Sequence, residues 1–234
     1  MTNRKLSSED LEICSTINSG HFSDNYKIRF RQRNCLGHKE AIVKKVHPLT
    51  EKEVELKLVT VKHQNIVTYL GYISEPFVDL LVMEPAELTL RDYPRNFSTP
   101  EIRKQWTLEL CAAVRYLHTE LNEPIVHRHI ASSKCLLFPQ AGRTPYVLKL
   151  SDYDYFGKSW TSFKDKLLSK DILETNFAPE VRKHFAFSTA SDIYALAAVL
   201  QADMRITESV LVRCWMDRPE DRPSIKKVIY LVTE

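Results

Sequence analysis

The sequence predicts an α+β protein in which a small β-rich part is followed by a larger, mainly helical part. Short alternating or apolar runs dominate residues 11–84, and a helical apolar stripe begins close to residue 99. The chain has 234 residues and only five glycines, with no internal repeat and no long flexible linker. That length is enough to bury a sizeable core, so we expect residues 1–234 to form a single two-part domain.

The first part has the composition of several short strands with one helix among them. The helix is expected at residues 50–61, where Val54, Leu58 and Val61 recur at the spacing of one helix face. The strand-like runs lie at residues 11–13, 26–30, 41–43, 66–72 and 78–83.

The second part begins with a strong helix signal. Thr99-Pro100-Glu101 combines a hydroxyl cap, a proline in the first turn and an acid near the positive end of the helix dipole. An apolar stripe follows, formed by Ile102, Trp106, Leu110, Ala113 and Leu117. Apolar runs within residues 136–153 predict a hairpin, and further helices are expected at 191–202, 207–216 and 224–232.

Composition excludes several classes of function. Thirty-three Lys and Arg against 30 Asp and Glu give a net charge of +3, which is too mild to indicate nucleic acid or a membrane surface as a partner. The five cysteines form no CxxC pair, so neither a zinc site nor a disulfide framework is expected. The sequence has no apolar signal core at its start and no run of 18 apolar residues, and we expect a cytoplasmic protein.

A series of short motifs carries a family resemblance. In chain order they occupy residues 17–26, 41–44, 63–67, 82–84, 127–129, 151–154, 178–180, 191–194, 214–215 and 222–223. In that order they resemble the glycine-rich loop, the third-strand lysine, the turn after the αC helix, the hinge, the catalytic loop, the metal-binding segment and the closing motifs of the protein kinase superfamily. The stretch 130–136 is most similar to the tyrosine-kinase and tyrosine-kinase-like branch.

The resemblance implies a bilobal fold with an N-lobe at about 11–84, a hinge at 85–88 and a C-lobe at 89–234. It also implies positions for ATP and its metal ion. The family-equivalent ATP positions are Gly20, Lys44, Glu84, Ala86 and Asp152, and Asp152 is also the metal position.

The first lobe departs from the family where the nucleotide would lie. Asn18 and Ser23 replace two of the three glycines that let the loop bend over phosphates, and only Gly20 remains. Asn25 stands where a valine caps the adenine, and Ile42 replaces the alanine that leaves room for the ring. These changes favour an ordinary hairpin with weak or no ATP binding.

The sequence does not decide which glutamate would pair with Lys44. Glu53 and Glu55 flank the expected position, Val54, and either one is equally consistent with a solvated charge on a helix face. Only nine residues separate Lys44 from Glu53, so the first turns of the helix are expected to be missing.

The catalytic loop shows the clearest change. His129 stands where an aspartate would orient the substrate hydroxyl, and Lys134 stands where an asparagine would bind the metal. An ammonium cannot ligate Mg²⁺, so no magnesium is expected; Lys134 would instead neutralise a phosphate or pair with Asp152. Asp154 replaces a glycine, and it either chelates a cation with Asp152 or one of the two carboxylates pairs with a lysine.

The motifs that hold the family's fold are present. Glu180 and Arg222 resemble the buried salt bridge of the C-lobe, and Asp192 resembles the aspartate that binds the catalytic-loop backbone. Arg222 follows Asp192 by only 30 residues, so the αG region is expected to be shortened; a splicing or gene-model artefact would give the same pattern.

Together these changes predict a pseudokinase that acts as a protein-interaction or allosteric module, with an active kinase or a signalling complex as the kind of partner. One alternative is an active atypical kinase that uses His129 or Asp154. Another is a nucleotide sensor that binds ATP through Lys44 and Asp152 without turnover. The sequence leaves open whether the activation segment is phosphorylated at Ser159, Thr161, Ser162, Ser169 or Thr175.

Overall fold

The computed structural model divides the chain into two compact units. The first comprises Met1–His63 and Val67–Ala86, and the second comprises Gln64–Ile66 and Glu87–Glu234. The structure describes residues 5–19, 24–31, 39–46, 49, 53, 57, 60–74, 76–77, 79–142, 144–153 and 176–233.

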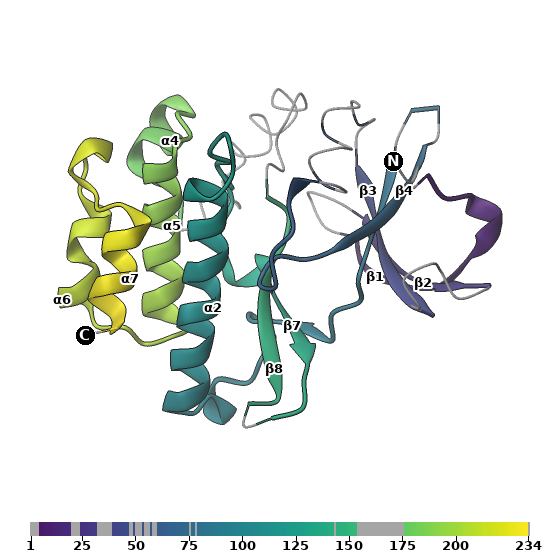
Figure 1. The fold of residues 1–234 in the computed structure, drawn as a ribbon, viewed down its shortest axis with the longest axis horizontal. Coiled ribbons are helices and arrows are strands. Elements are labelled where there is room, and N and C mark those ends of the chain that lie inside the picture. Colours follow the sequence, from purple (N-terminus) through teal and green to yellow (C-terminus); the bar gives the residue numbers. More distant parts are fainter. Residues whose placement is uncertain are drawn as a thin grey trace. The chain divides into compact units, whose positions relative to one another are not determined.

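The first unit is built on a five-stranded antiparallel sheet (Figure 1). A single short turn of helix, η1 (Ser8–Asp10), precedes the sheet. The strands are β1 (Leu11–Ser19), β2 (Asp24–Phe30), β3 (Glu40–Val46), β4 (Tyr69–Ser74) and β5 (Asp79–Met83), in the order β1-β2-β3-β5-β4. All five strand-like runs of the sequence therefore contribute to one sheet.

One face of this sheet carries the apolar core of the unit. Alternate residues of a strand point to opposite faces, and Ala41 and Val43 on β3 join a buried cluster with Ile28 and Val82. Ile42 and Lys44 point to the other face of β3. Lys44 is buried as well, so β3 is covered on both faces at this point.

The helix expected at residues 50–61 is described at four positions. Glu53, Lys57 and Thr60 have helical backbone, whereas Val61, the last residue of the expected apolar face, is buried but not helical. Val54, Glu55 and Leu58 lie outside the described residues. Lys57 is buried, and its Nζ lies 5.6 Å from the centre of the Tyr69 ring.

The second unit is mainly helical and confirms the α+β class (Figure 1). Its three-stranded sheet has the order β6-β7-β8. The elements are β6 (Leu88–Thr89), η3 (Arg95–Phe97), α2 (Pro100–Thr119), η4 (Ser132–Lys134), β7 (Cys135–Pro139), β8 (Tyr146–Leu150), α4 (Pro179–His184), α5 (Thr189–Ala202), α6 (Glu208–Leu211), η6 (Val212–Trp215), η7 (Pro219–Asp221) and α7 (Ile225–Thr233). No helix in the described part of the chain is both long and apolar enough to span a bilayer.

Helix α2 forms as its sequence predicts. The Thr99 side chain accepts a hydrogen bond from the Ile102 amide at 3.3 Å, and Pro100 occupies the first turn. All five residues of the apolar stripe are buried. The Trp106 indole also donates to the Tyr146 carbonyl at 3.2 Å, which ties α2 to β8.

Two details differ from the sequence-based expectation, and a third agrees with it. The hairpin at 136–153 forms as β7 and β8, but the short strand β6, which the sequence did not indicate, pairs with β7. The expected helix at 207–216 is two pieces, because the chain tightens from α6 into the 3₁₀ turn η6 at Leu211. Residues 203–207 link α5 to α6 and contain no helix, as the shortened αG region predicts.

Two leucines on α2 test this packing directly. Leu110 is fully buried, whereas Leu108 on the opposite side of the helix is 39% exposed. We expect Leu110→Ala to lower the free energy of unfolding by about 2–5 kcal/mol, because it leaves a cavity among packed side chains. Leu108→Ala is the matched control and is expected to change it by less than about 1 kcal/mol. Urea denaturation of both variants measures the difference, and equal losses would contradict the packing described here.

Candidate functional site

The β7–β8 hairpin brings Lys134 and Asp152 together. Cys135 and Leu150 are paired at the open end of the hairpin, and beyond them the Ser151 amide donates to the Lys134 carbonyl at 2.8 Å. The Ser151 hydroxyl donates to the same carbonyl at 3.1 Å. The Lys134 Nζ then lies 2.7 Å from Asp152 Oδ2, with the two side chains 14% and 9% exposed.

This contact decides between the roles that the sequence left open for Lys134. Its ammonium pairs with the carboxylate at the family's metal position, Asp152. An ammonium offers three donors and no lone pair, so it cannot be a metal ligand, and it repels a second cation at the same carboxylate. The residues present therefore do not fit a divalent ion at Asp152. Asp154, the other carboxylate considered, lies outside the described residues.

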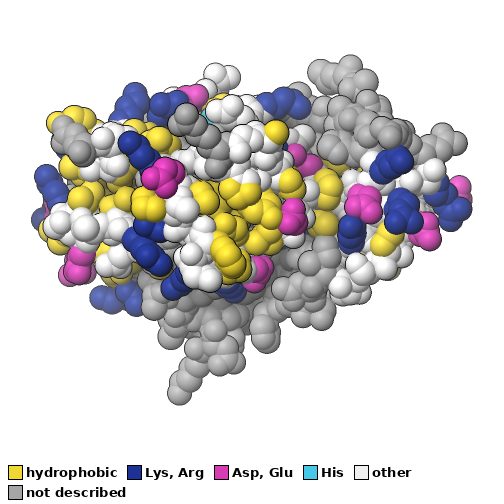
Figure 2. Space-filling model, turned by 90° about the horizontal axis from the view of Figure 1, so that it is seen from below, with side chains coloured by type: hydrophobic (Ala, Val, Ile, Leu, Met, Phe, Trp, Pro, Cys, Tyr) yellow, Lys and Arg dark blue, Asp and Glu magenta, His cyan; other side chains and the backbone are white. Residues whose placement is uncertain are grey.

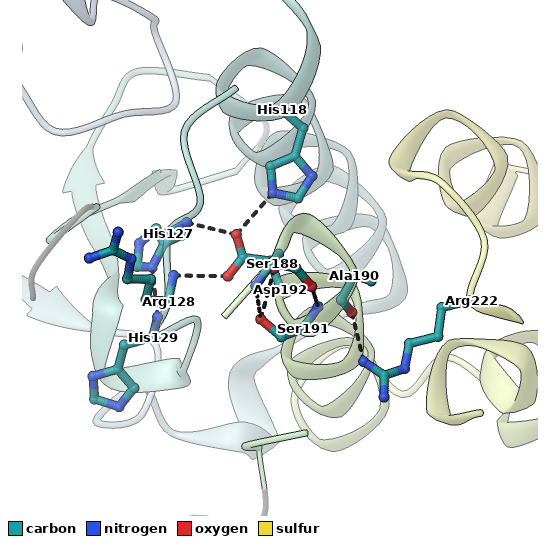
Figure 3. Close-up of polar contacts among 9 residues, drawn as sticks. All are labelled: His118, His127, Arg128, His129, Ser188, Ala190, Ser191, Asp192 and Arg222. Atoms are coloured by element: carbon teal, nitrogen blue, oxygen red, sulfur yellow. Dashed lines mark hydrogen bonds and ion pairs between the residues drawn. The ribbon is translucent and has the colours of Figure 1, made fainter. Parts of the chain in front are cut away.

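His129, at the position of the catalytic base, is packed against an aromatic ring. The residue is 4% exposed, and its ring stacks on Phe177, with ring centres 5.4 Å apart and planes 18° apart. Its backbone amide donates to His127 Nδ1 at 3.2 Å. Figure 3 shows the His129 ring pointing away from the Asp192 carboxylate.

The Asp192 carboxylate fixes the backbone of this loop (Figure 3). It accepts hydrogen bonds from the His127 amide at 2.7 Å, the Arg128 amide at 2.9 Å and His118 Nε2 at 2.9 Å. Arg128 has a φ of 72°, a conformation that costs a non-glycine residue energy and persists only where its surroundings hold it.

Asp192 is itself held at the start of α5. Ser188 and Ser191 form a reciprocal capping box: each side-chain oxygen accepts a hydrogen bond from the other residue's amide, at 3.2 Å and 3.0 Å. The carboxylate therefore projects from a capped first turn, where the helix dipole also favours a negative charge.

His127 is a neutral imidazole with a defined tautomer. Because its Nδ1 accepts from the His129 amide, its Nε2 carries the hydrogen and donates to the Ser151 carbonyl at 2.8 Å. Burial lowers the pKa of His127 to about 4, which agrees with an uncharged ring at neutral pH. His127 thereby connects the loop to the segment that carries Asp152.

A second buried contact holds the helical elements. Arg222 binds the Glu180 carboxylate with two nitrogens, at 2.6 Å and 2.8 Å. The same guanidinium donates to the carbonyls of Ala190 at 3.1 Å, Met216 at 2.8 Å and Asp217 at 3.3 Å. The Arg222 side chain is fully buried, and its guanidinium donates all of these hydrogen bonds to groups within the protein.

The remaining expected ATP positions lie in the first unit. Lys44 is buried on β3, opposite Asn25 on β2. The Glu84 carboxylate accepts from the Thr68 amide at 2.7 Å, and the Glu84 amide donates to the Thr68 carbonyl at 3.1 Å. Glu84 thus joins the end of β5 to the residue before β4.

Four further candidates belong to this part of the sequence, and two of them are described. Ala86 is half-buried, as is Glu53, one of the two glutamates considered as a partner for Lys44. Gly20 and Glu55 lie outside the described residues.

Sequence reasoning missed two participants. His118, near the end of α2, binds Asp192 from 74 positions away, and nothing in its local pattern distinguishes it from an ordinary helix-end histidine. Phe177 covers His129 with its ring. Its position, directly before the 178–180 motif, gave a signal for its segment but none for this contact.

Known proteins place these features in context. The family model described as protein kinase domain matches residues 11–213. Mitogen-activated protein kinase kinase kinase dlk-1 of Caenorhabditis elegans is 27% identical over 72% of this chain, which spans 17% of that protein. Mitogen-activated protein kinase kinase kinase 7 of Bos taurus is 24% identical over 96% of this chain and 44% of its own length. Guanylate cyclase 2D of Rattus norvegicus is 24% identical over 74% of this chain and 19% of its own length.

The buried Arg222 contact predicts a large effect on stability. We expect Arg222→Met to lower the free energy of unfolding by about 3–5 kcal/mol, because it leaves the Glu180 carboxylate without its partner. Arg218→Met is the matched control, since Arg218 makes only exposed contacts with Glu220 and Asp221. Its urea midpoint is expected to stay close to that of the wild type. Equal midpoints for the two variants would contradict a structural role for the buried pair.

The low pKa of His127 predicts a pH dependence of stability. The unfolded chain takes up the proton near pH 6.5 and the folded chain near pH 4, so stability falls as pH decreases through that window. His127 contributes about 3 kcal/mol to this loss in the wild type. His127→Asn removes the titrating ring, so its unfolding free energy is expected to fall less between pH 6.5 and 4. Identical pH slopes in urea denaturation would argue against a buried neutral His127.

Proposed function

This chain belongs to the protein kinase domain family, and from that premise we propose that it is a pseudokinase, a domain that transfers no phosphate and acts by binding another protein. The chain spans less than half the length of the relatives described above, so this proposal concerns the domain alone.

The environment of His129 carries the proposal. A base for phosphoryl transfer must reach the substrate hydroxyl within about 2.6–3.2 Å, and in this family an aspartate does so with a negative charge. His129 is 4% exposed, and its ring carries no negative charge and stacks on Phe177. A buried ring packed against a phenyl group is poorly placed to accept a proton from an incoming protein substrate.

The contrast between scaffold and chemistry supports a binding role. Asp192 and Arg222 make the contacts that hold a kinase C-lobe together, while the groups at the base and metal positions are His129 and Lys134. The side chains that hold the fold are therefore present, whereas those that would carry out the reaction are replaced. Figure 2 shows Lys and Arg scattered over the displayed face among apolar and acidic side chains, which suits a protein surface better than nucleic acid.

A labelling assay tests the catalytic half of the proposal. Purified protein is incubated with labelled ATP, Mg²⁺ or Mn²⁺ and generic protein substrates, alongside Lys44→Ala and an active kinase as a positive control. We expect wild-type incorporation to equal that of Lys44→Ala, because neither the base nor the metal position has its usual side chain. Incorporation above that level would overturn the proposal. Its loss in His129→Ala would then identify an active atypical kinase.

The binding half is tested by affinity capture with matched variants. A partner that recognises the folded domain is expected to be retained by the wild type and by Lys44→Ala, in which only a nucleotide position is changed. Arg222→Met, which weakens the fold, is expected to capture less of it. A protein captured by the wild type and lost with Lys44→Ala would point to the nucleotide-sensor alternative.

A further inference from the structure

The carboxylate of Asp152 forms an ion pair with a lysine of the same chain. The Lys134 ammonium lies 2.7 Å from Asp152 Oδ2, and both side chains are largely buried, at 14% and 9% exposure. A pair at this depth differs from a surface ion pair, because its members have lost most of their water and the attraction between them offsets part of that loss.

The hairpin enforces this contact. Lys134 directly precedes β7 and Ser151 directly follows β8, and two hydrogen bonds from Ser151 to the Lys134 carbonyl extend the pairing of the strands by one step. Asp152 follows with a φ of 64°, outside the usual range for a residue other than glycine. The backbone thus brings the two side chains together irrespective of any ligand.

We propose that the Lys134 ammonium takes the place of a divalent cation at Asp152, so that Ser151 and Asp152 keep their arrangement without metal and the site binds neither Mg²⁺ nor Mn²⁺. A hard cation prefers oxygen ligands, which Asp152 and an oxygen-bearing side chain at position 134 would both supply. An ammonium at position 134 supplies only hydrogen-bond donors. Within the described residues, no group of three His, Cys, Asp or Glu side chains is arranged to hold a metal.

The proposal shares Lys134 with the proposed function, but metal binding tests it whatever the labelling assay shows. It also makes a gain-of-function prediction. Lys134→Asn removes the positive charge and supplies a carboxamide oxygen, which would open the site to a divalent ion. Lys134→Arg keeps the charge and would leave the site closed.

Manganese binding tests this directly, by the loss of the electron paramagnetic resonance signal of free Mn²⁺ on titration with protein. We expect no specific binding by the wild type or by Lys134→Arg. Lys134→Asn is expected to bind Mn²⁺ with a Kd at least tenfold lower than any residual wild-type value, and Lys134→Asn/Asp152→Asn is expected to lose that binding. Circular dichroism confirms that each variant is folded, and Lys134→Gln serves as a second neutral variant.

Two results would overturn the proposal. One is Mn²⁺ binding by the wild type that Asp152→Asn abolishes, as chelation by Asp152 with another carboxylate would produce. The other is a folded Lys134→Asn or Lys134→Gln with no gain in affinity. The labelling assay on the same wild-type sample separates the two proposals. A protein that binds Mn²⁺ at Asp152 without transferring phosphate would refute the proposal for Lys134 and leave the proposed function standing.

Discussion

The buried carboxylate of Asp192 is the interaction on which the second unit depends. A charge withdrawn from water is tolerated only where hydrogen bonds replace its solvation, and here three donors converge on two oxygens. Two of these donors are consecutive backbone amides, which fixes the turn at Arg128 in a left-handed conformation. The direction of the loop beyond Arg128 follows from that turn.

The order imposed by Asp192 extends to the segment that contains Asp152. With the turn fixed, His127 is placed so that one ring nitrogen accepts from His129 and the other donates to Ser151. Ser151 in turn holds Lys134. The contacts from Asp192 to the Lys134–Asp152 pair therefore form one continuous set in which each polar group is oriented by the next. This explains how the loop holds one backbone arrangement with His129 and Lys134 at two of the family's functional positions.

Much of this fold was predictable from sequence because its signals are local or periodic. The cap at Thr99 and the stripe along α2 depend on residues within a few turns of one another, and both formed as expected. The roles of Asp192 and of the Glu180–Arg222 pair were anticipated from resemblance, since helix patterns alone do not reveal which buried charges meet. The break between α6 and η6 was not anticipated, because apolar spacing does not distinguish an α-helix from a 3₁₀ turn over four residues.

The sequence predicted which positions form the site, but it predicted their contacts less well. The sequence identified Lys134 and Asp152, but a lysine side chain is long and flexible enough to reach several acceptors, and only the register of the β7–β8 hairpin selects Asp152. The stacking of His129 on Phe177 depends on two segments separated by about fifty residues, which no local pattern records.

If Lys134 takes the place of a metal ion, the solution conditions that affect order at Asp152 also change. Order that depends on a bound metal follows the metal concentration by mass action, since the bound state gains stability in proportion to RT ln(1 + [L]/Kd). Order that depends on Lys134 is independent of any such concentration, because the cation is covalently part of the chain. Under the two proposals above, a loop held in one arrangement would suit a domain that acts by binding another protein. A catalytic cycle, by contrast, must bind and release nucleotide with its metal. In this respect the same lysine that removes a metal ligand contributes to the scaffold that remains.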